Sequence, residues 1–281
     1  MRAIILSAGQ GRRLLPHTAE LPKCLLPVDG DRSVLELQLE ALAACGVDEV
    51  TVMVGFGAES VESFLDQRSA RGPKIRTRYN PFFTHSDNLI TCWLAGTEMD
   101  GDFLLLNGDT LFENAVLERV LAARPAPVAL AIDRKPAYTD DDMKVTLGPA
   151  MRLVGIGKKL AASSVHGESI GLMRFSGEGG HLFRAGLERI VRNPAALKKW
   201  YLEVLHDLAA SVVIEAVSIQ GLWWSEIDSF SDLAGVRADL ALRRQQLDSA
   251  HRQKLSLTRK GDRDGDHSDD DTQPRAAERV L

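Results

Sequence analysis

The first residues of the chain combine an apolar run, two glycines and two cations at a spacing suited to a polyphosphate. Residues 2–8 read as a buried strand that ends in small residues. Gly9 and Gly11 then allow a tight turn in which the backbone approaches a ligand closely. Arg13 and Lys23 place positive charge just downstream. Together these residues predict a phosphate-binding loop at the end of a strand.

Two common phosphate-binding motifs do not fit this loop. A P-loop needs Gly-Lys-Ser/Thr directly before a helix, and no such run follows Gly11. The dinucleotide fingerprint needs a third glycine at position 14, where this chain has leucine. The loop therefore belongs to neither class.

The stretch from Gly9 to Lys23 resembles the signature of the nucleoside-triphosphate transferases, also called sugar-phosphate nucleotidyltransferases. That signature is Gly-x-Gly-x-Arg-Leu-x-Pro-x-Thr-x-x-x-Pro-Lys, and this chain meets every fixed position. The resemblance implies that Arg13 contacts the β- and γ-phosphates and that Lys23 contacts the α-phosphate. It also places the backbone around Ala8, Gly9 and Gly11 in the nucleotide site.

Nucleotidyl transfer depends on positioning and charge neutralisation more than on covalent chemistry. An acceptor phosphate is largely a dianion at neutral pH, because its second pKa is about 6, so it can attack without a dedicated base. The protein must still bring two anions together and stabilise the departing pyrophosphate. This reaction calls for cations, backbone N–H donors and Mg²⁺ as cofactor.

Two aspartates are the candidate metal ligands. Asp109 directly follows the buried run 103–108 and forms a turn with Gly108. We assign Gly108 to the nucleotide site. Asp228 ends a later strand-like segment before a helix. In the family, one metal aspartate lies in a Gly-Asp turn and the other in a late strand, and both positions match. The alternative for either aspartate is a helix cap.

Four residues are candidates for binding the acceptor. Lys158 follows the strand-like run 153–157, where relatives use a lysine, but Lys159 next to it leaves the choice between them open. Trp200 and Tyr201 are candidates for an aromatic cage around a cationic group, with ordinary packing as the alternative. Glu168 is a candidate contact for an acceptor hydroxyl or amine. The acidic run 140–142 either adds negative charge for such an acceptor or is a solvated turn.

Segments 80–89, 141–145 and 167–171 resemble the branch that contains phosphocholine and 2-aminoethylphosphonate cytidylyltransferases. The resemblance implies transfer of CMP from CTP to a small phosphorylated or phosphonate acceptor, with release of pyrophosphate. Asn88 becomes a base or ribose contact, with a capping role as the alternative. A sugar-1-phosphate transferase using dTTP, UTP or GTP is the other enzyme reading. A non-catalytic nucleotide-binding regulator is disfavoured, because both cations and both metal aspartates are present.

The first half of the chain alternates strand-like and helix-like segments. Such alternation predicts an α/β fold with a Rossmann-like mixed, mostly parallel sheet flanked by helices, which binds ligands at the carboxyl ends of its strands. The expected strands are 2–8, 49–54, 74–79 and 102–106, and the expected helices are 34–45, 58–65, 88–97 and 114–123.

The second half is expected to extend this sheet and to carry the acceptor. Its expected strands are 128–133, 143–147, 153–157, 168–175, 212–219 and 223–227, and its expected helices are 181–192, 195–210 and one from 230 to beyond 247. We therefore expect a single domain over residues 1–250. Residues 1–125 form its nucleotide-binding half and residues 126–250 its acceptor-binding half. A disordered polar tail is expected over residues 254–281.

Composition limits the class of protein. The chain has 281 residues, of which 44% are hydrophobic and 26% charged, as in a soluble globular protein. No run approaches the roughly 18 apolar residues of a membrane helix, and no secretory signal is evident. Three dispersed cysteines and a net charge of −5 favour a cytoplasmic protein without a nucleic-acid partner. A homo-oligomer is compatible with these features.

Overall fold

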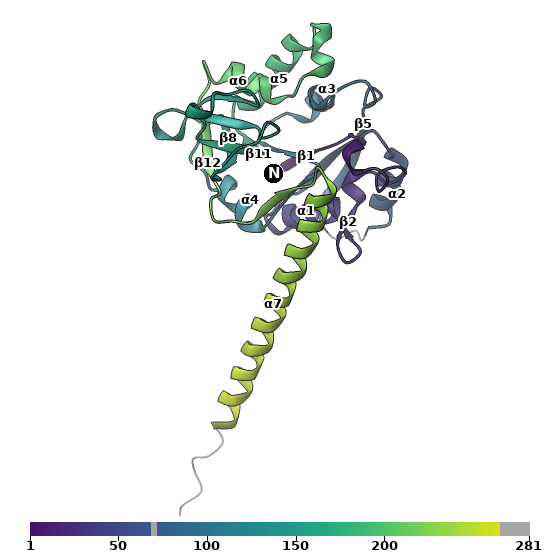
Figure 1. Ribbon diagram of the computed structural model, residues 1–281, viewed down its shortest axis with the longest axis vertical. Coiled ribbons are helices and arrows are strands. Elements are labelled where there is room, and N and C mark those ends of the chain that lie inside the picture. The colour runs from purple at the N-terminus through teal and green to yellow at the C-terminus, as the bar shows by residue number, and fades with distance from the viewer. Residues whose placement is uncertain (69–71, 265–281) are drawn as a thin grey trace, which may run out of the picture. The chain divides into compact units, whose positions relative to one another are not determined.

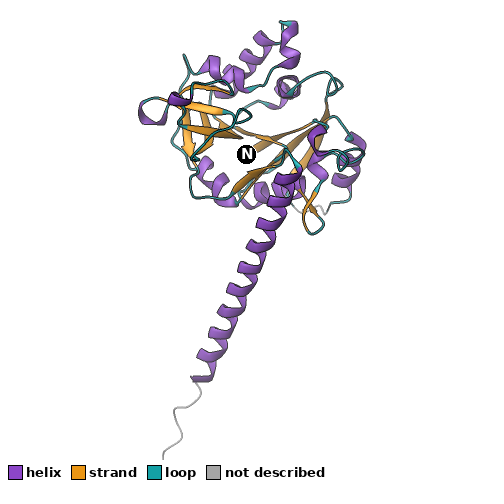
Figure 2. Cartoon of the chain, in the orientation of Figure 1, coloured by secondary structure: helices purple, strands orange, loops and turns teal. Residues whose placement is uncertain are grey.

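The computed structural model describes residues 1–68 and 72–264. A nine-stranded mixed sheet organises residues 1–236 (Figures 1 and 2). Its strands are β1 (Arg2–Ser7), β4 (Glu49–Val54), β5 (Lys74–Tyr79), β6 (Phe103–Asn107), β8 (Val128–Asp133), β9 (Lys144–Leu147), β10 (Leu153–Gly157), β11 (Gly167–Phe175) and β12 (Ile214–Ser218). Short strands lie outside this sheet: β2 (Pro27–Asp29), β3 (Arg32–Ser33), β7 (Thr110–Phe112) and β13 (Trp224–Glu226).

The direction of the strands confirms the mixed, mostly parallel sheet. Strands β6, β1, β4 and β5 are neighbours in that order and run parallel. Strand β11 pairs antiparallel with β6, β8 and β9, and β10 pairs antiparallel with β9. Because β12 runs parallel to β8, only β10 and β11 oppose the common direction.

Both faces of the sheet are buried, as a doubly covered α/β sheet requires. Successive side chains of a strand point to opposite faces. Accordingly, Ile4 and Leu105 belong to one apolar core, whereas Ile5 and Leu104 belong to the other. The helices are α1 (Val34–Ala44), α2 (Ala58–Asp66), α3 (Asn88–Leu94), α4 (Asn114–Leu121), α5 (Gly179–Ile190), α6 (Leu202–Leu208) and α7 (Phe230–Asp264). None of the described helices has an apolar stretch long enough to cross a bilayer.

The helix expected over residues 195–210 is interrupted. The chain forms a 3-10 helix over Pro194–Lys198, becomes extended at Lys199 and resumes as α6. The carbonyl of Leu197 accepts from the backbone N–H of Asp87 at 2.7 Å, and the carbonyl of Lys199 accepts from that of Leu89 at 3.3 Å. These bonds satisfy N–H groups at the start of α3, which have no partner within that helix. A tertiary contact thus breaks the expected helix.

The disordered tail expected from residue 254 stays a prediction, and the structure gives residues 254–264 as the end of α7. Helix α7 continues to Asp264, through a stretch rich in lysine, leucine and arginine, which are good helix formers. The remainder of that expected tail, residues 265–281, lies outside the described residues. The first compact unit ends at Val236 rather than near residue 250, and the described part of the second unit, residues 237–264, is the rest of α7.

Candidate active site

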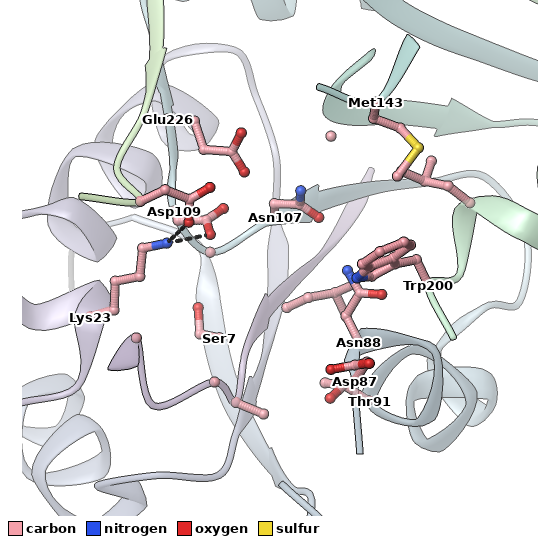
Figure 3. Close-up of a pocket in the computed structure, with 18 of the residues that line it drawn as sticks. Ser7, Lys23, Asp87, Asn88, Thr91, Asn107, Asp109, Met143, Trp200 and Glu226 are labelled. Carbon is pink, nitrogen blue, oxygen red and sulfur yellow. Dashed lines mark hydrogen bonds and ion pairs between the residues drawn. The ribbon is translucent and has the colours of Figure 1, made fainter. Parts of the chain in front are cut away.

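A cleft of about 440 Å³ opens where β1 and β6 end (Figure 3). It brings together residues that lie more than 200 positions apart in the chain. Tyr201 is the one site residue expected from the sequence that does not line this cleft. Those that do are Ala8, Gly9, Gly11, Arg13, Lys23, Asn88, Gly108, Asp109, Lys158, Glu168, Trp200 and Asp228.

Backbone conformation and one hydrogen bond shape the glycine loop. Gly11 has a φ of 65°, in the left-handed region that favours glycine, and a Cβ there would lie 3.2 Å from the Cβ of Lys23. The buried hydroxyl of Thr18 donates to the carbonyl of Gly11 at 2.8 Å. The threonine of the sequence signature therefore fixes the loop that approaches the ligand.

Gly108 allows the turn after β6 to pack against the end of β1. Its N–H donates to the carbonyl of Leu6 at 2.9 Å, and any Cβ at this position would clash with Ser7 Oγ. Asp109 is consequently held next to the glycine loop. The sequence placed Gly108 in the nucleotide site, and the structure shows that close packing is one reason for a glycine there.

Three carboxylates converge on this end of the cleft. One oxygen from each of Asp109, Glu226 and Asp228 lies within 4.8 Å of the others. The ammonium of Lys23 lies 2.7 Å from Asp109 Oδ2 and 2.8 Å from Asp228 Oδ1. Sequence reasoning missed Glu226. Its spacing in the sequence could have revealed it. Alternate residues of a strand share one face, so Glu226 lies on the same side as Trp224 and Asp228, and all three line the cleft.

The ionisation of the cluster reflects this crowding. Burial would lower the pKa of Lys23, but the adjacent carboxylates of Asp109 and Asp228 raise it overall. Burial would raise the pKa of Asp228, but Lys23 and Arg13 lower it overall. Although much of Glu226 is exposed, desolvation in the cleft wall and the charges of Asp109 and Asp228 raise its pKa to about 8. Near neutral pH the raised pKa of Glu226 favours its protonated form, so Lys23 and Arg13 face the charges of Asp109 and Asp228.

The residues present fit a divalent cation. Asp109 Oδ1 is buried and has no hydrogen-bond partner among the described residues. Carboxylate oxygens are the hard donors that Mg²⁺ prefers, and such sites use one or two protein carboxylates with substrate oxygens. Asp109, Glu226 and Asp228 are the residues that could hold such an ion.

Neither of the two candidate metal-binding aspartates acts as a helix cap. The carboxylate of Asp232 accepts from the backbone N–H groups of Asp228 and Ser229, and Ser229 Oγ accepts from the N–H of Asp232. This reciprocal pair is a capping box at the start of α7 and leaves the Asp228 side chain to the cleft. Asp109 is separated from α4 by strand β7, and Glu113 is the residue before that helix.

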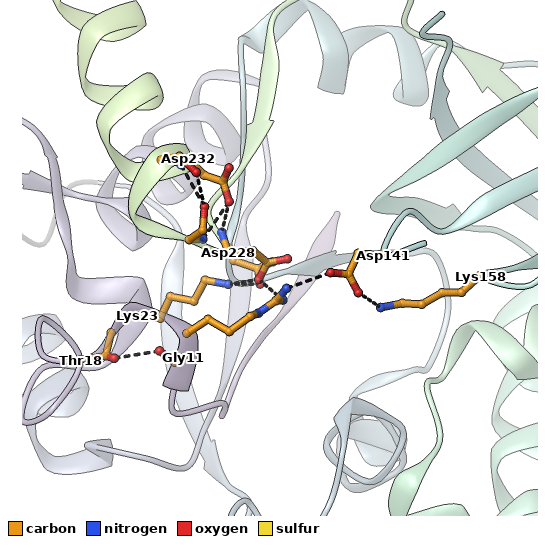
Figure 4. Close-up of polar contacts among 11 residues, drawn as sticks. Gly11, Thr18, Lys23, Asp141, Lys158, Asp228 and Asp232 are labelled. Carbon is orange, nitrogen blue, oxygen red and sulfur yellow. Dashed lines mark hydrogen bonds and ion pairs between the residues drawn. The ribbon is translucent and has the colours of Figure 1, made fainter. Parts of the chain in front are cut away.

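An exposed carboxylate joins the two sides of the cleft. Arg13 Nη1 lies 3.3 Å from Asp141 Oδ2, and Lys158 Nζ lies 3.3 Å from Asp141 Oδ1 (Figure 4). The other terminal nitrogen of Arg13 lies 2.8 Å from Asp228. Asp141 therefore occupies a position between the cation expected to bind nucleotide and the cation expected to bind acceptor.

The acceptor side holds one stacked cation and one buried ion pair. Lys158 Nζ lies 4.4 Å from the centre of the Trp200 ring, and Lys158, unlike Lys159, lines the cleft. The buried Glu168 is 2.8 Å from Lys135, which is also 2.8 Å from Asp142. Burial is the largest cause of the raised pKa of Glu168, which Lys135 only partly opposes. Glu168 thus anchors the loop before β9 as well as facing the cleft.

The expectation that Tyr201 forms part of an aromatic cage is wrong. Its side chain is fully buried, and its ring meets Phe183 edge-on with the centroids 6.4 Å apart. Its hydroxyl donates to Asn107 Oδ1 at 3.0 Å, and its backbone N–H donates to Asn88 Oδ1 at 3.2 Å. The extended backbone before α6 turns Tyr201 into the core and leaves Trp200 37% exposed.

Asn88 is not a capping residue. It is the first residue of α3, and Asp87 occupies the capping position without a side-chain cap bond. The side-chain oxygen Oδ1 of Asn88 accepts from the backbone N–H of Tyr201. The side-chain nitrogen Nδ2 is therefore the donor that Asn88 can offer to a ligand in the cleft. The capping alternative is therefore removed, and contact with base or ribose stays a prediction.

The doubly covered mixed sheet, the glycine loop at a strand end and the lysine among carboxylates define a protein of the nucleotidyltransferase class. The chain belongs to the family of MobA-like NTP transferase domains, whose model matches residues 3–211.

Relatives support this membership at several levels. CMP-5'-(3-aminopropyl)phosphonate synthase of Streptomyces rubellomurinus is 42% identical over 134 residues, which are 48% of this chain but 21% of that protein. CTP:phosphoglutamine cytidylyltransferase of Campylobacter jejuni is 25% identical over 257 residues, covering 83% of this chain and 98% of the relative. The solved inositol-1-phosphate CTP transferase of T. maritima has the same fold, with a TM-score of 0.71 at 19% identity over 85% of this chain and 95% of that chain.

Proposed function

We propose that the protein is a Mg²⁺-dependent cytidylyltransferase that moves CMP from CTP to a small phosphonate or phosphorylated acceptor. The observation that carries this proposal is the position of Lys23 between Asp109 and Asp228, in one cleft with the glycine loop and with Lys158. The CMP-aminophosphonate synthase and the cytidylyltransferase among its relatives favour CTP. The partners are therefore CTP and a small acceptor.

In this reaction an oxygen of the acceptor attacks the α-phosphorus of CTP. A new P–O bond forms to the acceptor, and the bond from the α-phosphorus to the bridging oxygen of the β-phosphate breaks to release pyrophosphate. A dianionic acceptor needs no base, so the demand on the protein is to reduce repulsion between the two anions. When bound by Asp109 and Asp228, with Glu226 beside them, Mg²⁺ would neutralise phosphate charge.

The side chains divide this task by position. Lys23 remains protonated, because Asp109 and Asp228 raise its pKa despite burial, and it carries positive charge to the α-phosphate. When CTP binds, Arg13 would leave Asp141 and contact the β- and γ-phosphates. The backbone near Gly9 and Gly11 would approach oxygens of the same phosphates. When the acceptor binds, Lys158 would leave Asp141 and contact the phosphate or phosphonate group of the acceptor. The donors are in place before reaction, so little reorganisation is required.

The test is pyrophosphate release with Mg²⁺, in a grid of CTP, UTP, dTTP, ATP and GTP against small acceptors. The acceptors are 2-aminoethylphosphonate, 3-aminopropylphosphonate, phosphocholine, inositol phosphate and glucose 1-phosphate. We expect the highest kcat/KM with CTP and an aminophosphonate or phosphocholine. Turnover only with a hexose phosphate would contradict the acceptor class. Nucleotide binding without turnover across the grid would contradict the enzymatic role and favour a regulator.

A further inference from the structure

Asn107, the last residue of β6, lies at the centre of the cleft. Figure 3 shows it between the carboxylates of Asp109 and Glu226 on one side and the side chains of Asn88 and Trp200 on the other. It is half-buried and occupies the last strand position before the turn that carries Asp109. The sequence drew attention to the glycine and aspartate of that turn, whereas Asn107 received no role.

Three elements fix the position of Asn107. The hydroxyl of the fully buried Tyr201 donates to Asn107 Oδ1 at 3.0 Å. From α1, Gln38 Nε2 donates to the backbone carbonyl of Asn107 at 2.8 Å. Gly171 lies on β11, the strand next to β6. It has a φ of 72°, and a Cβ there would clash with the side-chain amide nitrogen of Asn107. With its backbone fixed by Gln38 and its amide held by Tyr201 and Gly171, Asn107 presents one particular group to the cleft.

The group that it presents is a hydrogen-bond donor. A carboxamide has one accepting oxygen and one nitrogen with two N–H donors. Tyr201 already donates to the oxygen, and an anionic ligand has no donor for its second lone pair, so Nδ2 is the part of Asn107 that can bind such a ligand. Among the described residues none accepts a hydrogen bond from this nitrogen. Asn107 is thus a neutral donor next to the cluster of Lys23, Asp109 and Asp228.

We propose that Asn107 Nδ2 donates to a phosphorus-bound oxygen of the acceptor, and that Tyr201 is the positioning residue that orients the amide. The inference rests on the proposed function and names a group that binds the acceptor. The nucleotide phosphates already have Arg13, Lys23 and the glycine loop as partners. The acceptor side has Lys158, whose ammonium lies over Trp200. Asn107 lies between Asp109 and Trp200 (Figure 3), and hence between the proposed metal site and the proposed acceptor side.

Two substitutions at position 107 separate this role from a structural one. Asn107→Ala removes the donor, and we expect acceptor kcat/KM to fall about 10- to 100-fold, as for loss of a hydrogen bond to a charged group. Asn107→Asp keeps an acceptor for the Tyr201 hydroxyl but places a carboxylate against a dianion. Its acceptor kcat/KM should therefore fall further than that of Asn107→Ala. A purely structural role would produce the opposite order, because aspartate preserves the contact with Tyr201.

Tyr201→Phe tests the positioning role, with the exposed Tyr79→Phe as the matched control. We expect Tyr201→Phe to lower acceptor kcat/KM about 3- to 10-fold, as for loss of one neutral hydrogen bond, while Tyr79→Phe stays at the wild-type value. Calorimetric binding of CTP alone should stay within about twofold of wild type in both Asn107 variants. Wild-type acceptor kcat/KM in Asn107→Ala, or a smaller loss in Asn107→Asp than in Asn107→Ala, would overturn the inference.

The inference and the proposed function can fail separately. Absence of turnover by the wild-type protein would contradict the proposed function alone. In that case binding of 2-aminoethylphosphonate is measured by calorimetry, with a non-hydrolysable CTP analogue present. We expect Asn107→Ala to weaken this binding about tenfold or more. Equal binding by wild type and Asn107→Ala would overturn the role of Asn107.

Discussion

At the scale of single residues, Lys23 explains how three carboxylates can share one end of a cleft. Its ammonium contacts Asp109 and Asp228 at 2.7 and 2.8 Å, and these contacts outweigh the effect of burial on its pKa. Removing one partner of such a pair leaves the other charge uncompensated, which costs more than the pair itself contributes. The same residue thus supports the folded cluster and, in the proposed reaction, would supply positive charge to the substrate.

Asp109→Asn should lower kcat by about a hundredfold or more, because it removes an anionic ligand from the proposed metal site. The amide preserves the size of the side chain, so the circular dichroism spectrum should match that of the wild type. Pyrophosphate release over a range of Mg²⁺ concentrations measures the effect. Asp66→Asn, at the exposed end of α2, is the matched control and should be silent. Near-normal kcat in Asp109→Asn would remove Asp109 from the mechanism.

Cys24 lies beside Lys23 in the cleft, but its thiol is not a nucleophile. Burial raises its pKa to about 12, with a further contribution from the charge of Asp109, so the thiol stays protonated near neutral pH. We expect iodoacetamide to label the partly exposed Cys45 well before Cys24 and Cys92. Mass spectrometry of the native protein measures the order. Labelling of Cys24 first would contradict this description of the cleft.

At the scale of elements, the site depends on what supports the turn after β6. Gln38, on the buried face of α1, donates from one nitrogen to the carbonyls of Asn107 and Thr110, each at 2.8 Å. These two bonds bracket Asp109. Helix α1, none of whose residues lines the cleft, therefore determines where the proposed metal ligand Asp109 lies.

Gln38→Leu should destabilise the protein by about 1–3 kcal/mol, because two carbonyls lose their donor in a buried position. It should also lower kcat about tenfold, since a small displacement of Asp109 disturbs the reacting geometry. Denaturant unfolding and pyrophosphate release measure the two effects. The exposed Gln67→Leu in the same assays should change neither. Loss of stability with unchanged kcat would show that the turn holds Asp109 without help from α1.

Sequence patterns were enough to predict several strands of the sheet. The expected strands over 49–54, 74–79, 128–133 and 153–157 match β4, β5, β8 and β10 exactly, because each is a short run bounded by turn residues. The break before α6 could not be predicted, since it depends on α3 using the carbonyls of Leu197 and Lys199. The burial of Tyr201 follows from that break. Glu226 was missed because only the fold brings it beside Asp109. Asn107 was missed because only the fold shows that Tyr201 and Gly171 orient its amide.

At the scale of the whole catalytic unit, residues 1–236, the cleft joins two halves whose cations share a counter-ion. Arg13 comes from the loop after β1 and Lys158 follows β10, and Asp141 contacts both (Figure 4). Each contact is 3.3 Å long, and the Asp141 side chain is 72% exposed, so each pair contributes little. Contacts of this kind orient the two cations, and a phosphate group of a bound substrate could replace Asp141 at a small cost in free energy.

Asp141→Asn therefore tests whether this carboxylate competes with substrate or binds it. If Asp141 is only a counter-ion, its loss should lower KM for CTP and for the acceptor about two- to fivefold each, with kcat unchanged, because exposed pairs contribute about 0.2–1 kcal/mol. The neighbouring Asp140→Asn controls for the change in net charge. A higher KM for aminophosphonates in Asp141→Asn, with no change for acceptors without an amine, would contradict competition. Asp141 would then be the group that binds the amine, and the acidic run 140–142 would help to select the acceptor.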